Sequence, residues 1–284
     1  MNDQTNSGSD SRRLAVIKVG GDILLDEIQR SGLAKNIIGL LKENWRVVVL
    51  HGGGPQLSAM QSRCGIEPRK VAGRRVTSQE DLVLVKQVLC GQVNVDLVSL
   101  MQAHGVNAFG CHGASGKLIQ ANKRPPIKVS GGGSEPIDFG EVGDVTLINT
   151  ELLHSLLSAD LVPVIASLGI NANGDVFNIN ADTTVVQIAR QMSAELLVFV
   201  TSIGGIFQDI KDPASRFTEL DETTARRYIN SGIIVEGMIP KVEEALSLLT
   251  SGVGTVAIVD TRDPSAFTSI AKGNVDYGTL IRER

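Results

Sequence analysis

Short apolar runs alternate with segments of helical periodicity along most of this chain, and no other feature limits its fold as strongly. The apolar runs, each of strand length, are Leu14–Val19, Arg46–Leu50, Val106–Gly110, Leu161–Ala166, Leu196–Val200 and Thr255–Val259. The helical segments are Asp26–Glu43, Pro55–Cys64, Ser78–His104, Thr150–Ser158, Thr183–Met192, Glu222–Ser231 and Pro240–Thr250. Strands that alternate with helices favour a parallel sheet with helices on both faces. The pattern therefore predicts an α/β chain, a three-layer αβα sandwich with a mainly parallel central sheet.

Changes in this pattern divide the chain into parts. Residues 1–13 are polar and carry no apolar periodicity, so we expect a disordered tail there. A soft boundary near Ile170–Gly174 separates two expected lobes, 14–170 and 171–284, which share one sheet. Between Lys117 and Leu147, prolines and glycines interrupt the helical pattern, which predicts a mobile hairpin or lid.

Charge and cysteine content exclude several classes of partner. A formal net charge of -4 supplies no positive field for nucleic acid. No apolar run approaches the roughly 20 residues that span a bilayer, and the first residues lack the apolar region of a secretory signal. The widely spaced cysteines Cys64, Cys90 and Cys111 form neither a disulfide framework nor a zinc motif. We therefore expect a cytoplasmic protein with no membrane or nucleic-acid partner and no metal held by protein ligands.

Two glycine-rich turns follow the first two predicted strands. Lys18-Val-Gly-Gly21 ends one strand, and His51-Gly-Gly-Gly-Pro55 ends the next. Ligands bind at the carboxyl ends of the strands in open parallel sheets, and the free amides of a helix start favour an anion. Either turn alone is also explained as an ordinary tight turn. Lys18 favours a functional interpretation, because a lysine that closes a buried strand needs an anionic partner.

Three helix starts carry further polar signals. Thr77 followed by Glu80 predicts a capping box for the longest helix. Asn178-Ile-Asn-Ala-Asp182 places two amides and a carboxylate ahead of another helix, where capping explains Asp182 and a shared ligand-facing side explains Asn178 and Asn180. Gly237-Met-Ile-Pro-Lys241 puts Lys241 in a first helical turn, against the helix dipole. Lys241 is then either a solvated surface lysine or the partner of a bound phosphate.

The common nucleotide and hydrolase motifs are absent from the sequence. The segment Cys111–Leu118 lacks the first glycine of a Walker loop and the hydroxyl residue after its lysine, and no glycine run fits a dinucleotide fingerprint. There is no GxSxG and no HExxH. P-loop, dehydrogenase, hydrolase and zinc-enzyme interpretations are therefore disfavoured.

From Leu14 to the C-terminus, the ordered blocks resemble the amino acid kinase family. Within it they are most similar to the branch that phosphorylates N-acetyl-L-glutamate. The matching blocks are Lys18–Gly21, His51–Gly54, Gly73–Thr77, Asn178–Asp182, Gly204–Ile206 and Gly237–Lys241. Gly73–Thr77 is the most discriminating block, because related carbamate, aspartate and uridylate kinases carry different substrate loops.

The resemblance implies an ATP-dependent transfer of phosphate to the side-chain carboxylate of N-acetyl-L-glutamate, an early step of arginine biosynthesis. Lys18 and Lys241 would stabilise the transferred group, with Asp182 organising both lysines. Mg²⁺ is expected mainly on the phosphates. The substrate would meet Gly20, Gly21, Gly53, Gly54, Arg75, Asn178 and Asn180, with Arg75 on its α-carboxylate. ATP would contact Thr201, Ser202, Gly204, Gly205, Ile206, Phe207, Gly237 and Met238.

Two positions depart from the family pattern, and they leave alternatives open. Ser202 stands where an aspartate usually follows the threonine beside the nucleotide. His112 lies where members often carry other residues, and we expect it to be packed or solvent-facing. The N-terminal helix and the acidic, glycine-rich segment of arginine-inhibited members are not evident, so we expect weak or no arginine inhibition. A homodimer with Ser78–His104 near its interface is expected.

Two other functions remain open from the sequence. One is a kinase for a related acid, such as a carrier-linked aminoadipate, which Arg75 and its block disfavour. The other is a non-catalytic sensor of acetylglutamate or nucleotide, which Ser202 makes conceivable.

Overall fold

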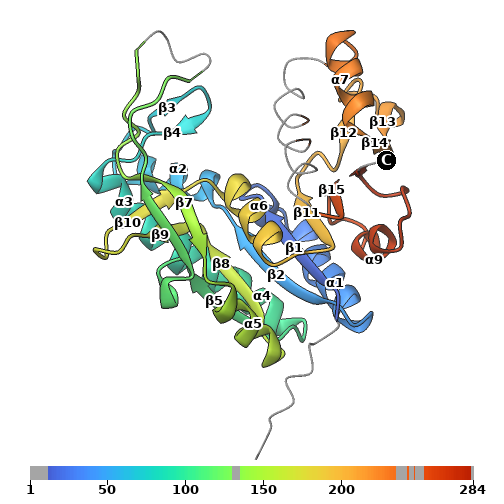
Figure 1. The fold of residues 1–284 in the computed structure, drawn as a ribbon, viewed down its shortest axis with the longest axis horizontal. Helices are drawn as coiled ribbons and strands as arrows, with labels where there is room; N and C mark the ends of the chain where they lie inside the picture. The colour runs from blue at the N-terminus through green and yellow to red at the C-terminus, as the bar shows by residue number, and fades with distance from the viewer. Residues whose placement is uncertain (1–11, 130–134, 235–241, 243–245, 247–252, 283–284) are drawn as a thin grey trace, which may run out of the picture.

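The computed structural model describes residues 12–129, 135–234, 242, 246 and 253–282. Its central feature is an eight-stranded sheet, in the order β14-β16-β15-β11-β1-β2-β8-β5 (Figure 1). The strands are β1 (Leu14–Val19), β2 (Arg46–His51), β5 (Ala108–His112), β8 (Val162–Ala166), β11 (Leu196–Val200), β14 (Glu219–Leu220), β15 (Thr255–Val259) and β16 (Thr279–Ile281). From β15 to β5 all neighbours are parallel, whereas β16 runs antiparallel to β15. The predicted mainly parallel sheet is confirmed.

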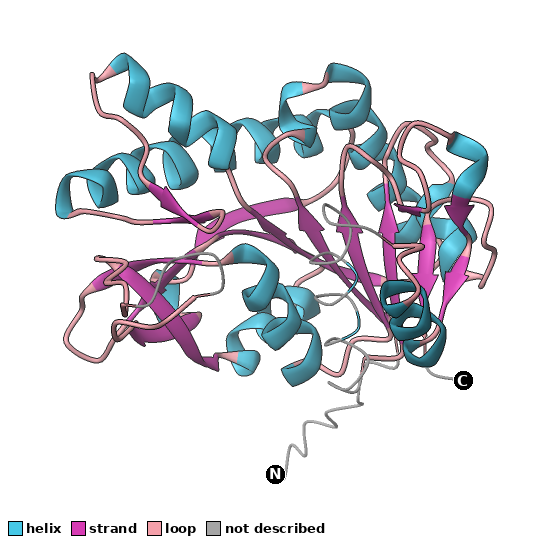
Figure 2. Cartoon of the chain, turned by 90° about the horizontal axis from the view of Figure 1, so that it is seen from above, coloured by secondary structure: helices cyan, strands magenta, loops and turns pink. Residues whose placement is uncertain are grey.

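Helices cover both faces of this sheet (Figure 2). They are α1 (Glu27–Lys42), α2 (Gly54–Arg63), α3 (Gln79–Val85), α4 (Asn94–Ala103), α5 (Thr150–Ser158), α6 (Ala181–Gln191), α7 (Glu222–Asn230) and α9 (Ala266–Ala271). The short helical turns are η1 (Ile23–Leu25), η3 (Ser115–Lys117) and η4 (Pro213–Ser215).

Side chains of β1 alternate between two hydrophobic clusters, as the period of a strand requires. Leu14 and Val16 pack with residues of α5, α6 and α7 on one face. Ala15 and Ile17 pack with residues of α1, α4 and α9 on the other. A strand buried on both faces explains why this segment is a continuous apolar run. The predicted three-layer sandwich is confirmed.

A small closed barrel, β10-β7-β6-β9, lies at one end of the large sheet. Its strands are β6 (Ile119–Lys123), β7 (Val142–Ile148), β9 (Leu168–Ile170) and β10 (Val176–Ile179). β6 and β7 pair antiparallel, so the hairpin predicted between Lys117 and Leu147 is confirmed. Two further pairs are β3 (Lys70–Val71) with β4 (Arg74–Arg75), and β12 (Ile206–Phe207) with β13 (Arg216–Phe217).

The longest predicted helix differs from expectation in two ways. Its cap is Ser78, whose side chain pairs reciprocally with Asp81, so the capping box predicted at Thr77 was wrong by one residue. Thr77 is instead fully buried and donates its amide to the Phe139 carbonyl. The helix is also interrupted by a π-helical segment, η2 (Lys86–Val93), between α3 and α4.

In the described part of the chain, one helix, Gln79–Ala103, is long and apolar enough to cross a membrane by length and composition. The core helix of a globular protein meets the same criteria, and this helix packs its apolar side chains against α2, β5 and β8. The helix is weak evidence for a membrane.

The three cysteines are all free and differ in exposure. Burial raises the pKa of the Cys90 thiol to about 11 and that of Cys111 to about 12, whereas Cys64 is exposed. Thiolates, not thiols, attack disulfide reagents. When the native protein is mixed with a chromogenic disulfide reagent at pH 8, we expect only Cys64 to react rapidly. The absorbance trace of the Cys64→Ser variant should therefore lack the fast phase. A fast phase that survives this change would contradict the expectation.

Candidate active site

The two glycine turns touch each other at the carboxyl edge of the sheet. β1 and β2 are parallel neighbours, so Lys18–Gly21 and His51–Pro55 end side by side. A Cβ added to Gly21 would lie 2.8 Å from Pro55 Cδ and 3.1 Å from Gly53 Cα. The Gln56 side-chain amide also donates to the Gly21 carbonyl at 2.7 Å. The close approach requires glycine at position 21.

Lys18 has an anionic partner within the protein. Its side chain is 16% exposed, and its Nζ lies 2.5 Å from Asp182 Oδ1 in the first turn of α6. The cap of that helix is Asn180, whose Oδ1 accepts the Thr183 amide at 2.9 Å. Capping as an explanation for Asp182 was therefore wrong, and its carboxylate pairs with Lys18 instead.

The backbone amides around Lys18 differ in whether they are free to donate a hydrogen bond to a ligand. The Gly20 amide donates to the Val200 carbonyl at 3.3 Å, so in this structure it is not free for a ligand. Gly53 and Gly54 begin α2, where the first amides of a helix have no partner within it. The amides at the start of α2 are the stronger candidates to meet an anion.

A cavity of about 730 Å³ has Asp182, the partner of Lys18, in its wall. Three further predicted site residues line it: Arg75, Asn178 and Asn180. Asn178 and Asn180 border the same cavity, as does Ile179 between them, so the lining alone does not separate alternate positions. The Asn178 amide donates to Thr77 Oγ1 at 3.0 Å, which joins β10 to the segment after β4.

The Arg75 side chain is held by α2. It donates to Ser58 Oγ at 2.8 Å, to the Gly54 carbonyl at 3.2 Å and to Gln61. Burial lowers the pKa of Arg75 while the nearby Asp81 carboxylate opposes that shift. An arginine stays protonated in proteins. The guanidinium is thus a fixed cation at the cavity wall.

Sequence reasoning missed three charged residues of the same cavity, Arg74, Arg124 and Asp144. Arg124 donates to Asp144 Oδ1 at 2.9 and 2.6 Å. The signal for Arg124 was its place just before the paired prolines in the interrupted segment. His112 is half-buried, and its Nδ1 lies 3.4 Å from Ser115 Oγ, which agrees with the expectation of a packed histidine.

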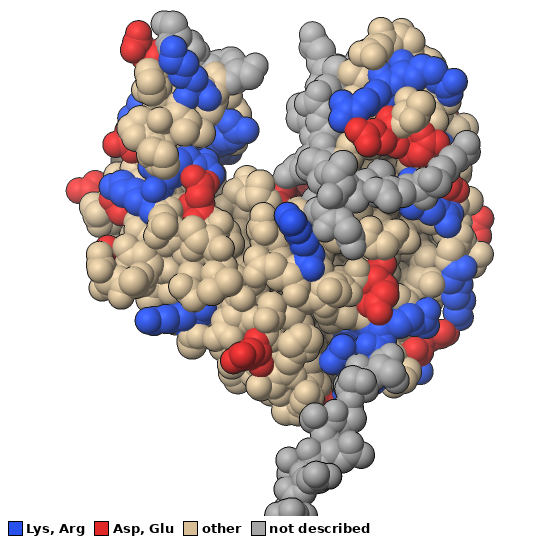
Figure 3. All heavy atoms as spheres, viewed as in Figure 1, with Lys and Arg blue, Asp and Glu red and all other residues tan. Residues whose placement is uncertain are grey.

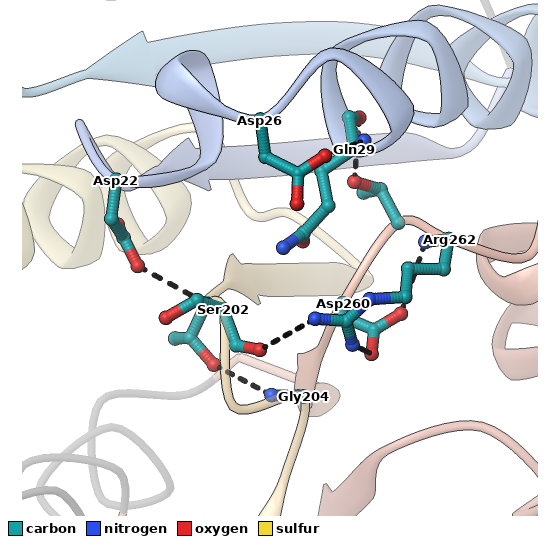
Figure 4. A network of polar contacts seen from close by, with 9 residues as sticks. Asp22, Asp26, Gln29, Ser202, Gly204, Asp260 and Arg262 are labelled. Carbon is teal, nitrogen blue, oxygen red and sulfur yellow. Dashed lines mark hydrogen bonds and ion pairs between the residues drawn. The ribbon is translucent and has the colours of Figure 1, made fainter.

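The loop predicted to meet the nucleotide lies at the carboxyl end of β11 (Figure 4). Thr201 Oγ1 accepts the Gly204 amide at 3.1 Å, and Gly204 has a left-handed φ of 75° that suits glycine. Arg262 donates to Asp260 at 2.6 Å and to the Ser202 carbonyl at 3.4 Å. Gly205 leads into Ile206, which is fully buried in the core, so its side chain is not exposed to a ligand. Phe207 is half-buried.

A carboxylate does lie beside Ser202, at a position for which no local sequence pattern was a signal. Asp22 Oδ2 accepts the Ser202 amide at 3.3 Å (Figure 4). Partial burial raises the pKa of Asp22, but hydrogen bonds from Ser202 and from backbone amides leave it below its ordinary value. The carboxylate beside Ser202 therefore comes from the turn that follows β1, not from the loop that follows β11.

Gly237, Met238 and Lys241 lie outside the described residues, as does most of the helix expected over Pro240–Thr250. In the space-filling view, the molecule is hollowed between the part that carries β3 and β4 and the part that carries α7 (Figure 3). The candidate site thus lies at a strand edge that borders an open hollow, where ligands of open α/β sheets bind.

The chain has a mainly parallel sheet whose carboxyl edge carries two glycine turns, a lysine–aspartate pair and a cavity lined by arginine. These features are typical of an α/β enzyme that binds phosphate groups at this edge. The model of the amino acid kinase family matches residues 13–260, and the chain belongs to that family. It is 44% identical over 244 residues to an acetylglutamate kinase of Anaeromyxobacter sp. (strain Fw109-5), covering 86% of this chain and 90% of the relative. An acetylglutamate kinase of Methanocella arvoryzae is 38% identical and covers 94% of this chain and 85% of its own length.

A solved structure agrees with this fold. The crystal structure of smu.665 from Streptococcus mutans UA159 matches with a TM-score of 0.74 and 28% identity, covering 95% of this chain and 99% of that one. A carbamate kinase from Giardia lamblia bound to AMP-PNP has a TM-score of 0.66 at 17% identity, and this likeness shows the fold alone.

Proposed function

We propose that this chain transfers the γ-phosphoryl group of ATP to the side-chain carboxylate of N-acetyl-L-glutamate, forming N-acetylglutamyl 5-phosphate for arginine biosynthesis. The observation that carries the proposal is the Lys18–Asp182 pair, which joins the first glycine turn to the cavity that Asp182 and Arg75 line. Relatives named acetylglutamate kinase match over most of this chain at 36–44% identity, which supports the choice of substrate.

The reaction needs positive charge more than it needs a base. A glutamate side chain has an ordinary pKa of about 4.3 and is a nucleophile at neutral pH without further deprotonation. The difficulty is to bring this anion to an anionic phosphoryl group, which positioning and preorganised charge overcome. Lys18 and Lys241 stabilise the transferred group, and Asp182 fixes the direction of the Lys18 ammonium. The amides of Gly21 and Gly53 add hydrogen bonds.

The cavity holds the acceptor. Arg75 binds the α-carboxylate through its planar fork, since arginine matches a carboxylate with two parallel hydrogen bonds. Asn178 and Asn180 contact the rest of the substrate, and Gly54 lets it approach the start of α2. A volume of about 730 Å³ is ample for an acylated amino acid.

The nucleotide lies along the loop Thr201–Phe207 and the Gly237–Lys241 segment. The described residues include no group of three or more metal-ligating side chains. Mg²⁺ would be held mainly by the phosphates of the nucleotide, where the ion would neutralise charge on them. Asp22 keeps a carboxylate near Ser202, so the serine does not by itself favour the sensor function.

We further propose a cytoplasmic homodimer with Ser78–His104 near its interface, two lobes at 14–170 and 171–284, and weak or no inhibition by arginine. Val83 and Val95 on this helix are 47% and 59% exposed, which supports a partner surface there.

A coupled ATP assay with four acceptors tests the proposal: acetylglutamate, glutamate, aminoadipate and carbamate. We expect kcat/KM for acetylglutamate to exceed that for glutamate by at least about 100-fold, because loss of the acyl group leaves buried polar partners unpaired. Preference for aminoadipate would favour the related-acid kinase. Measurable binding of acetylglutamate or nucleotide without turnover of any acceptor would favour the sensor.

A further inference from the structure

His51 begins the second glycine turn, yet its side chain is fully buried. It ends β2, one residue before Gly52. Burial lowers the pKa of His51 to about 4, so the ring is neutral at physiological pH and carries one proton. Which nitrogen carries that proton depends on the neighbours of the ring.

Asn94, at the start of α4, determines which ring nitrogen of His51 carries the proton. Its Nδ2 lies 3.0 Å from His51 Nε2 and 2.9 Å from the Val164 carbonyl. A carbonyl requires the NH₂ of the amide, not its oxygen, so the Asn94 amide has a defined orientation. An NH₂ group only donates, and therefore His51 Nε2 accepts. The proton must be on Nδ1.

His51 Nδ1 lies 2.8 Å from the Gly52 carbonyl and donates to it. The peptide that joins Gly52 to Gly53 is planar and trans, so its N–H points away from its C=O. Fixing the Gly52 carbonyl on His51 therefore turns the Gly53 amide away from the ring. Within the described part of the chain, no backbone acceptor is assigned to that amide.

The π-helical segment η2 also holds the Gly52–Gly53 peptide, because its side chains pack against Gly53. A Cβ added to Gly53 would lie 2.3 Å from Leu89 Cδ2 and 3.3 Å from Val93 Cγ2, so η2 packs directly on this glycine. Leu89 and Asn94 are five residues apart, which in an α-helix separates their directions by about 140°. The π-helix bonds residues i and i+5 and brings them toward one face. One helix face thus contacts both Gly53 and His51.

We infer that His51 and Asn94 are positioning residues, which hold the Gly52–Gly53 peptide so that the Gly53 amide is directed at the transferred phosphoryl group. Neither side chain touches substrate. The inference rests on the proposed function for the identity of the anion, and on the hydrogen bonds above for the geometry.

Two replacements of His51 separate positioning from packing. Asparagine places its amide at the position of Nδ1 and keeps a donor for the Gly52 carbonyl. Glutamine places its amide near Nε2 and leaves that carbonyl without a donor. We expect His51→Gln to lower kcat about 100-fold, since one misdirected oxyanion donor costs about that much. We expect His51→Asn to stay within about tenfold of the wild type, with KM changed less than kcat in both.

His104 supplies the matched control. Its Nδ1 lies 2.9 Å from the Leu100 carbonyl, the same kind of contact, at the end of α4. His104→Asn and His104→Gln should leave kcat nearly unchanged. His51→Asn and His51→Gln could instead lower kcat equally and lower thermal stability equally. That result would show that His51 contributes only to packing, and it would overturn the inference.

Nitrogen NMR of the wild-type protein tests the geometry if the variants fail to fold. We expect the His51 ring to be protonated at Nδ1, and the Gly53 amide resonance to shift when a non-hydrolysable ATP analogue is added. A proton on Nε2, or an unmoved Gly53 resonance with bound analogue, would overturn the inference. These readouts need no turnover, so a wild-type protein that phosphorylates none of the acids refutes the proposed reaction separately.

Discussion

Lys18→Ala is expected to lower kcat for acetylglutamate phosphorylation by about 1,000-fold while changing KM for either substrate less than about fivefold, because its charge acts mainly in the transition state. The Lys18 side chain is 16% exposed and its ammonium lies 2.5 Å from Asp182 Oδ1, so its position is fixed before substrate binds. A fixed charge in a partly desolvated site does not have to reorganise during the reaction. Steady-state kinetics with both substrates varied measures the effect.

Lys272→Ala is the control for this prediction. Lys272 Nζ also forms a short ion pair, 2.6 Å from Glu43 Oε1, but both side chains are on the surface between α9 and α1. Removing an exposed ion pair changes stability by about 1 kcal/mol or less, and kcat should not change. If the two alanine variants had equally small effects on kcat, Lys18 would not be the charge that stabilises phosphoryl transfer.

Arg75→Ala is expected to raise KM for acetylglutamate by about 100-fold, with kcat within about fivefold of the wild type, since a lost charge-assisted fork removes binding in both ground and transition state. The guanidinium lies at the cavity wall, held by Ser58 Oγ and the Gly54 carbonyl. The KM for ATP should change little. Initial rates at saturating ATP and varied acetylglutamate give both constants.

Arg74→Ala makes the comparison specific, because Arg74 lines the same cavity and precedes Arg75 in β4. Each of the two substitutions removes one positive charge from the cavity wall, so the variants differ only in which arginine is lost. A larger rise of KM in Arg74→Ala than in Arg75→Ala would transfer the carboxylate-binding role to the neighbouring arginine.

Local patterns predicted most of the regular structure. The runs Leu14–Val19, Leu196–Val200 and Thr255–Val259 are β1, β11 and β15 with the same bounds, and Thr150–Ser158 is α5. These segments are buried on one or both sides, so their apolar spacing directly reflects their environment. The barrel was only partly predicted, as a hairpin, because pairing of β9 and β10 with it depends on contacts across the chain.

Errors in the prediction of the site have related causes. Thr77 and Ser78 both suit a helix cap, and only the backbone geometry selects Ser78. Asn180 and Asp182 are likewise both good caps, and the nearness of Lys18 to α6 leaves Asp182 as its partner. The likeness of these side chains explains why sequence alone did not assign them.

The sequence by itself determined three things: the alternation along the chain of most strands and helices of the large sheet, the two glycine turns, and the family. Each depends on short stretches of neighbouring residues. Tertiary structure alone decided which side chains meet at the sheet edge. Asp22 reaches Ser202 across neighbouring strands, and Asn94 reaches His51 because η2 brings positions five residues apart toward one helix face. Such contacts depend on sheet order and helix register, which arise from packing over the whole chain.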